Sequence, residues 1–183
     1  MIYRFIIISN EVENFMREIK IDAHDTFLSL HKAIQQTCGY DDEEMTSFTI
    51  CDDGWVKGQE VMLTDMGTSS EQDSYVMEST RLSELLIDEK QHLIYTYDML
   101  AERMFFIELS QIIPKEHLDE PVVSRSQGEA PPQRIDFDSL MNRNPIVTGG
   151  GADYVDEDML TSDDFDDEDL EIGGLDISDG EPF

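Results

Sequence analysis

Few side chains of this sequence have the types and spacing that chemistry requires. The histidines are scattered singly, at His24, His31, His92 and His117. Neither they nor the cysteines form a His-x-x-x-His or Cys-x-x-Cys pair, which the short zinc-binding motifs need. We therefore expect no metal site and no cofactor.

The two cysteines, Cys38 and Cys51, are the only candidate thiol nucleophiles. Cys38 falls on the apolar stripe of a predicted helix and Cys51 on an alternating strand, so both are interpreted as buried thiols that pack as small hydrophobic side chains. Cys51 and His92 are one candidate nucleophilic pair, but no local motif supports it.

Other catalytic motifs are missing too. The sequence has neither the glycine-rich loops that bind phosphate nor the Gly-x-Ser-x-Gly turn of hydrolases. The acidic run from Asp163 to Asp169 lacks the glycine and glutamate spacing of an EF-hand calcium loop. These observations disfavour an enzyme. The alternative that stays open is a small metal-dependent or hydrolytic enzyme with a cleft near Asp98, which would use Asp98, His31 and Cys51.

The charge of the chain restricts its partners. It has 42 Asp+Glu against 12 Lys+Arg, a formal net charge of −30. Residues 1–118 contain 23 acidic and 9 basic residues, whereas residues 119–183 contain 19 acidic and 3 basic residues. Nucleic-acid binding depends on Lys and Arg at phosphates, so we expect no direct nucleic-acid binding. A basic protein surface is the favoured partner, and no pattern identifies a small-molecule ligand.

The apolar segments are short. The run from Phe5 to Ile8 is followed at once by polar residues, so it does not fit a signal peptide. No segment approaches the roughly 20 apolar residues that span a bilayer. We expect no membrane association and a cytoplasmic protein with reduced thiols.

One helix organises the expected fold. Thr26 is a good N-cap, Gly39 supplies the positive φ of a helix end, and the apolar residues between them recur at three and four positions. This pattern predicts a helix over residues 27–38.

Alternating residues predict strands on both sides of that helix, at 1–8, 15–21, 46–51, 55–63, 92–97 and 104–113. Arg17 falls on an apolar-facing position, so it should lie near an edge or extend outwards. Asp53-Gly54 predicts a hairpin turn, residues 64–78 a loop, and Ser79-Thr80 the cap of a short helix through Leu86. The predicted class is α+β over residues 1–118, a mainly antiparallel sheet with one principal helix. It opens strand-strand-helix-strand, for which a β-grasp-like arrangement is one option.

Several short motifs occur together in order. They are Tyr3, Thr26-Phe27-Leu28 with Leu30-His31, Ile34-Gln35, Gly39-Tyr40, Phe48-x-Ile50, Tyr95-x-Tyr97-Asp98 and Gly128-Glu129-Ala130-Pro131-Pro132. On these motifs, residues 1–133 resemble the plasmid pRiA4b ORF-3-like family. The resemblance implies a compact α+β domain without an established biochemical activity, and it makes His31, Tyr95, Tyr97 and Asp98 the candidate family-motif positions.

The sequence departs from the family pattern after Asp98. The family usually continues with Phe-Gly-Asp and then Trp and His, whereas here Met99-Leu100-Ala101-Glu102-Arg103 follows. A cysteine that is common before the Gly-x-x-Pro-Pro segment is replaced by Ser124 or a neighbour. If the family has a polar or metal site built from those groups, this chain is expected to have lost it.

The C-terminal region changes in composition from about Pro121. We interpret residues 119–141 as an extended, proline-containing segment docked on the domain and residues 142–183 as an acidic, largely disordered tail. Apolar residues interrupt the acids and are candidates for docking on the domain or a partner. They are Ile135, Phe137, Leu140, Tyr154, Met159, Leu160 and Phe165.

Two interpretations of this tail stay open, a solubilising segment without a partner and a segment that engages basic protein surfaces. The expected function is a non-enzymatic protein-interaction module.

Overall fold

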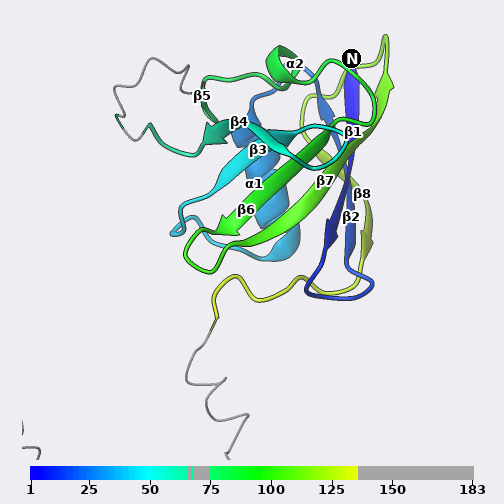
Figure 1. The fold of residues 1–183 in the computed structure, drawn as a ribbon. Helices are drawn as coiled ribbons and strands as arrows, with labels where there is room; N and C mark the ends of the chain where they lie inside the picture. The colour runs from blue at the N-terminus through cyan, green and yellow to red at the C-terminus, as the bar shows by residue number, and fades with distance from the viewer. Residues whose placement is uncertain (66, 68–74, 136–183) are drawn as a thin grey trace, which may run out of the picture. The chain divides into compact units, whose positions relative to one another are not determined.

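The computed structural model describes residues 1–65, 67 and 75–135 of the chain. Among them are eight strands and two helices (Figure 1). In chain order they are β1 (Ile2–Ser9), β2 (Met16–Asp22), α1 (Phe27–Cys38), β3 (Ser47–Cys51), β4 (Lys57–Met62), β5 (Tyr75–Val76), α2 (Leu82–Leu85), β6 (His92–Asp98), β7 (Arg103–Ile113) and β8 (Val122–Gln127). No helix of these residues is long and apolar enough to cross a membrane.

The strands form one sheet in the order β5-β4-β3-β6-β7-β1-β2-β8. Every neighbouring pair is antiparallel except β4 and β5. The prediction of a mainly antiparallel sheet with few helices is therefore confirmed. The chain opens β1, β2, α1, β3, but β6 and β7 lie between β3 and β1 in the sheet.

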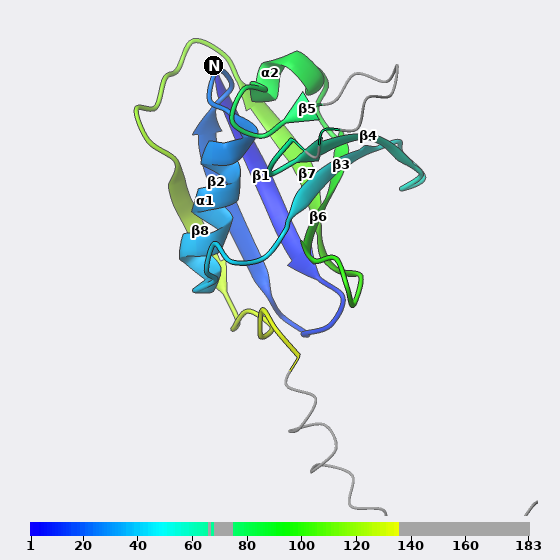
Figure 2. The ribbon, with the colours of Figure 1, turned by 90° about the vertical axis from the view of Figure 1, so that its left-hand side faces the viewer.

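The helix α1 begins and ends where the sequence predicts. The Thr26 hydroxyl accepts a hydrogen bond from the Ser29 N–H at 3.3 Å, and Gly39 takes a left-handed φ of 71°. Figure 2 shows α1 lying along one face of the sheet. The apolar side of α1 and the alternate strand residues that face it form the core, whose largest fully buried side chains include Tyr3, Phe5, Phe27, Phe48, Tyr95, Tyr97 and Phe105.

Three local predictions differ from the structure. The predicted loop 64–78 contains the short strand β5, which pairs with β4. The N-cap of α2 is Arg81, one residue after the predicted Ser79-Thr80. Trp55 is not in a strand but has a positive φ of 63°. The cause is Asp52, whose carboxylate accepts hydrogen bonds from the backbone N–H groups of Gly54 and Val56 at 2.9 and 2.8 Å. These bonds extend the predicted Asp53-Gly54 turn through Trp55.

The strand β8 continues the sheet beyond residue 118, where we placed the end of the α+β domain. It pairs antiparallel with β2, and Arg17 of β2 donates to the carbonyl oxygen of Gln127 at 2.7 Å. At Gly128, with φ at 69°, a Cβ would lie 2.6 Å from the carbonyl oxygen of Asn14, so only glycine fits this turn. The backbone from β8 to residue 135 thus belongs to the folded unit.

Of the apolar residues proposed for docking, only Ile135 is among those the structure describes. The others, Phe137, Leu140, Tyr154, Met159, Leu160 and Phe165, lie outside the described residues, as does the predicted tail at 142–183.

Candidate functional site

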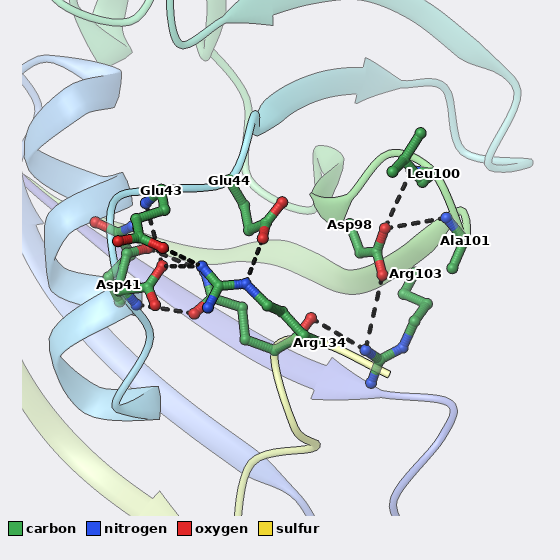
Figure 3. A network of polar contacts seen from close by, with 10 residues as sticks. Asp41, Glu43, Glu44, Asp98, Leu100, Ala101, Arg103 and Arg134 are labelled. Atoms are coloured by element: carbon green, nitrogen blue, oxygen red, sulfur yellow. Dashed lines mark hydrogen bonds and ion pairs between the residues drawn. The ribbon is translucent and has the colours of Figure 1, made fainter. Parts of the chain in front are cut away.

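Three segments that are distant in sequence meet in one network of polar contacts (Figure 3). They are the loop after α1, the β6–β7 connection and the segment after β8. The Gln133 amide fixes the last of these, because its oxygen accepts from the Asp41 N–H at 2.8 Å and its nitrogen donates to the Asp41 carbonyl at 3.0 Å. The Tyr40 hydroxyl donates to the Pro131 carbonyl at 2.7 Å. The segment 131–134 is therefore held against the loop after α1.

Arg103, the first residue of β7, is the buried cation of this network. Its guanidinium is 8% exposed and donates to both carboxylate oxygens of Glu11, at 3.0 Å from Nε and 2.8 Å from Nη2. It also donates to the Gln133 carbonyl at 3.1 Å and lies over the Tyr97 ring, whose hydroxyl donates to Glu11. Burial alone would lower the pKa of Arg103, but the bonds to Glu11 outweigh it and the pKa is raised. Arg103 is therefore a permanent structural cation.

The Asp98 carboxylate stabilises the β6–β7 turn. Its carboxylate accepts hydrogen bonds from the N–H groups of Leu100 and Ala101 at 3.1 and 3.0 Å, and it lies 4.0 Å from Arg103. An aspartate that accepts bonds from the residues following it is a common way to stabilise a turn. Asp98, the last residue of the Tyr-x-Tyr-Asp motif, thus stabilises the β6–β7 turn that directly follows it.

Arg134 is the exposed cation of the network. Its guanidinium is 50% exposed and is bound by the carboxylates of Asp41 at 3.0 Å and Glu43 at 2.9 Å, and by that of Glu44. Hydrogen bonding to Glu44 and the charges of the neighbouring carboxylates raise the pKa of Arg134. We call the Asp41–Glu44 loop the acidic loop. It surrounds one arginine with three carboxylates and leaves that arginine accessible to solvent.

An open pocket of about 300 Å³ lies beside the acidic loop. Its lining combines charged and apolar side chains: Glu44, Asp98, Leu100, Ala101, Arg134 and Ile135. Leu100 is almost fully exposed, so its side chain is accessible to a partner. The site thus places three carboxylates that bind a guanidinium next to the apolar side chains of Leu100 and Ile135.

His31 and Tyr95 lie in the core instead, away from this site. His31 is 2% exposed, and its Nδ1 is 2.9 Å from the Tyr95 hydroxyl and 3.4 Å from that of Thr46. Its nearest partner is therefore on strand β6, and Thr46 lies in the loop just before β3. Burial lowers the pKa of His31 to about 4, so the ring is neutral at pH 7.

This burial predicts an acid-sensitive stability. The unfolded chain binds a proton at His31 near pH 6.5, whereas the folded protein does so only near pH 4. The stabilisation is therefore complete above about pH 6.5 and is lost as the pH falls towards about 4. Urea unfolding across this range should show a decreasing free energy of unfolding. The His31→Gln variant should have a flatter profile, and an identical slope in the two proteins would contradict the assignment.

The three residues of the enzyme alternative have separate environments. The Cys51 thiol has the Thr49 carbonyl as its partner at 3.6 Å, and burial raises its pKa, which disfavours a thiolate. Among the described residues, no contact joins Cys51, His31 and Asp98 to one another. Cys51 does lie opposite His92 in the sheet register, but that ring stacks on Trp55 at 4.1 Å between centroids.

Two further candidates for chemistry are the other thiol, Cys38, and a cluster of side chains that could hold a metal ion. Burial raises the pKa of Cys38 to about 12, so it is protonated at neutral pH. Within residues 1–65, 67 and 75–135, no group of three or more His, Cys, Asp and Glu side chains is arranged to hold a metal ion.

We did not predict that Arg103, Glu11, Arg134 or the acidic loop belongs to a site. A signal was present for two of them. The loop is a run of four acids directly after the helix end, and Arg134 is one of only three basic residues after residue 118. Their proximity depends on a contact between residues about 90 positions apart, which no local pattern specifies.

The architecture defines the class of protein first. It is an α+β domain in which one principal helix covers one face of a mainly antiparallel sheet. The chain matches the family of plasmid pRiA4b ORF-3-like proteins over residues 2–167 and belongs to that family. The match extends beyond the last recognisable motif at Pro132.

A solved structure supports the same fold. The chain is similar to a protein of unknown function from Methanosarcina mazei Go1, with 23% sequence identity and a TM-score of 0.55. The similarity covers 72% of this chain and 71% of that protein. At this identity the likeness concerns the fold alone. No curated protein matches the chain.

Proposed function

We propose that this protein is an interaction module that binds a basic segment of a partner protein. The observation that carries the proposal is the binding of Arg134 by the three carboxylates of the acidic loop. The planar guanidinium presents several N–H donors that match carboxylate oxygens. A partner's arginine that displaced Arg134 would meet the same carboxylates.

The adjacent pocket suggests which arginine is preferred. Leu100 and Ile135 line it next to Glu44 and Asp98. An apolar side chain next to the partner's arginine would contact these two residues and remove them from water. The proposed recognition element is therefore an arginine followed by a large apolar residue.

The acidity of the rest of the chain would assist this binding. Residues 119–183 have 19 acidic and 3 basic residues, which attract a basic partner over a long range and raise the association rate. In this proposal the acidic tail makes the first encounter and its apolar residues add contacts. The reduced thiols of Cys38 and Cys51 suit a cytoplasmic location.

A peptide titration tests the proposal. The probe is a fluorescein-labelled peptide with two arginines, each followed by leucine, measured by anisotropy at physiological salt. The Asp41→Asn/Glu43→Gln/Glu44→Gln variant should bind it about tenfold more weakly, since three exposed pairs of roughly 0.5 kcal/mol each are removed.

A matched variant controls for net charge. Glu78→Gln/Asp88→Asn/Glu116→Gln removes three exposed carboxylates that make no side-chain ion pair among the described residues. It should keep most of the affinity. An equal loss in both variants would mean that the peptide senses only the overall charge, and the acidic loop would then have no special role.

A further inference from the structure

A second, separate site lies on the sheet face opposite α1. Residues directly opposite each other on paired strands share one face of a sheet. Ser47 of β3 lies opposite Thr96 of β6, and Thr96 lies opposite Met104 of β7. Thr49, two residues along β3, lies opposite Glu60 of β4. The residues between them, such as Phe48, Tyr95 and Phe105, are in the core, so the three hydroxyls lie on the outer face.

The outer face is hollowed at this position. An open pocket of about 300 Å³ is lined by the three hydroxyl residues together with Lys57, Gly58, Glu60, Met99, Glu102 and Met104. A pocket at the lower end of the range for small-molecule sites suits a compact ligand.

Two hydroxyls of the pocket make no hydrogen bond to another described residue. Ser47 is 1% exposed and Thr49 is 6% exposed, yet neither side chain makes a hydrogen bond within the part of the chain that the structure describes. No buried side-chain oxygen or nitrogen of the described residues lacks a hydrogen-bond partner, so these two hydroxyls are not sealed in the core but reach solvent at the pocket. Because both side chains line the pocket, their hydroxyls are accessible to a molecule bound there.

Three charged side chains lie around these hydroxyls. Lys57 and Glu60 come from β4, and Glu102 comes from the β6–β7 connection. Across the described residues none of the three takes part in an ion pair, although Lys57, Glu60 and Glu102 line the same pocket. The pocket thus offers one ammonium and two carboxylates that are free to bind a ligand.

We propose that this pocket binds a small zwitterion of amino-acid size. Lys57 would bind the carboxylate of the ligand, and Glu60 and Glu102 would bind its ammonium group. The hydroxyls of Ser47, Thr49 and Thr96 would satisfy its remaining polar atoms, while Met99 and Met104 contact its carbon chain. An anion alone would be repelled by the two carboxylates, and a cation alone would be repelled by Lys57.

Methionine-methyl NMR of the full chain tests this assignment. The probes are the twenty standard amino acids, added singly, with acetate and ethylammonium as ligands that carry only one of the two charges. At least one amino acid should shift the Met99 and Met104 methyl signals saturably below about 10 mM, with the single-charge probes about tenfold weaker. No saturable shift with any amino acid, or equal binding of a single-charge probe, would overturn the proposal.

Two variants locate the binding. Lys57→Met removes the ammonium group, and Thr49→Val removes one hydroxyl with little change of shape. Each should lower the affinity about fivefold or more, whereas Lys20→Met, which makes the same charge change on β2, should not. The methyl signal of Met77, which is fully buried in the core, reports that each variant is folded. Unchanged affinity in a folded Lys57→Met protein would contradict the assignment.

Discussion

Replacing Phe105 with alanine is expected to destabilise the protein by about 3–5 kcal/mol. Phe105 is 0% exposed, and four aromatic rings surround it. Its centroid lies 4.6 Å from that of Tyr97, 5.0 Å from Phe15, 6.0 Å from Tyr40 and 6.3 Å from Tyr95. The deletion removes the ring and leaves a cavity that rigid aromatic neighbours cannot fill.

The next residue provides the control. Phe106 has the same side chain but lies on the outer face, half-buried, with an edge contact to Trp55 at 5.1 Å. Phe106→Ala should cost less than half as much, because its ring is only partly removed from water on folding. Urea unfolding of both variants measures the difference. Equal costs would mean that the two faces of β7 are assigned wrongly.

Replacing Glu11 with alanine is expected to cost about 2–3 kcal/mol. Breaking a buried ion pair from one side costs about 3–5 kcal/mol because the other charge is left without its partner. Glu11 remains 31% exposed, which reduces this value, but Arg103 at 8% exposure is well buried. The substitution also removes the acceptor of the Tyr97 hydroxyl.

Glu13→Ala is the matched control for that prediction. Glu13 is an exposed residue of the same β1–β2 connection, and exposed substitutions change stability by at most about 0.5 kcal/mol. Thermal and urea unfolding of both variants give the comparison. If Glu11→Ala were as harmless as Glu13→Ala, Arg103 would not depend on Glu11 for its charge compensation.

The helix α1 and most strands could be predicted because their signals are local. Thr26, the apolar stripe and Gly39 fix α1 within fourteen consecutive residues, and β6 and β7 follow from alternation. The strand β8 gave no such signal. All six of its residues are exposed, since it lies at the edge of the sheet, and an edge strand with little burial has no alternating apolar pattern to detect.

The contacts that form the candidate sites could not be predicted in the same way. Arg17 illustrates the difference, since the sequence predicted only that it lies near an edge or extends outwards. The structure shows it 5% exposed, with its guanidinium bonded to Thr37 of α1 and Gln127 of β8. Those partners are 20 and 110 residues away. Side-chain pairs of this kind depend on the complete strand order, which alternation along one strand does not specify.

The structure also indicates where the chain should be truncated to separate the acidic tail from the folded domain. An end at residue 120 would remove β8 and the Gly128 turn, so any effect could come from unfolding of the edge. A chain ending at residue 135 keeps both, together with Gln133 and Arg134. Comparison of that chain with the full protein therefore reports on residues 136–183, which include the acidic tail.

We propose that the acidic loop exchanges Arg134 for an arginine of a partner. The most direct measurement is the affinity of the arginine-leucine peptide for the full-length Arg134→Gln variant. Removing the internal competitor should tighten binding about three- to tenfold. Arg125→Gln, which makes the same charge change on the exposed strand β8, should leave the affinity nearly unchanged. Unchanged or weaker binding by Arg134→Gln, or equal tightening by Arg125→Gln, would contradict the account.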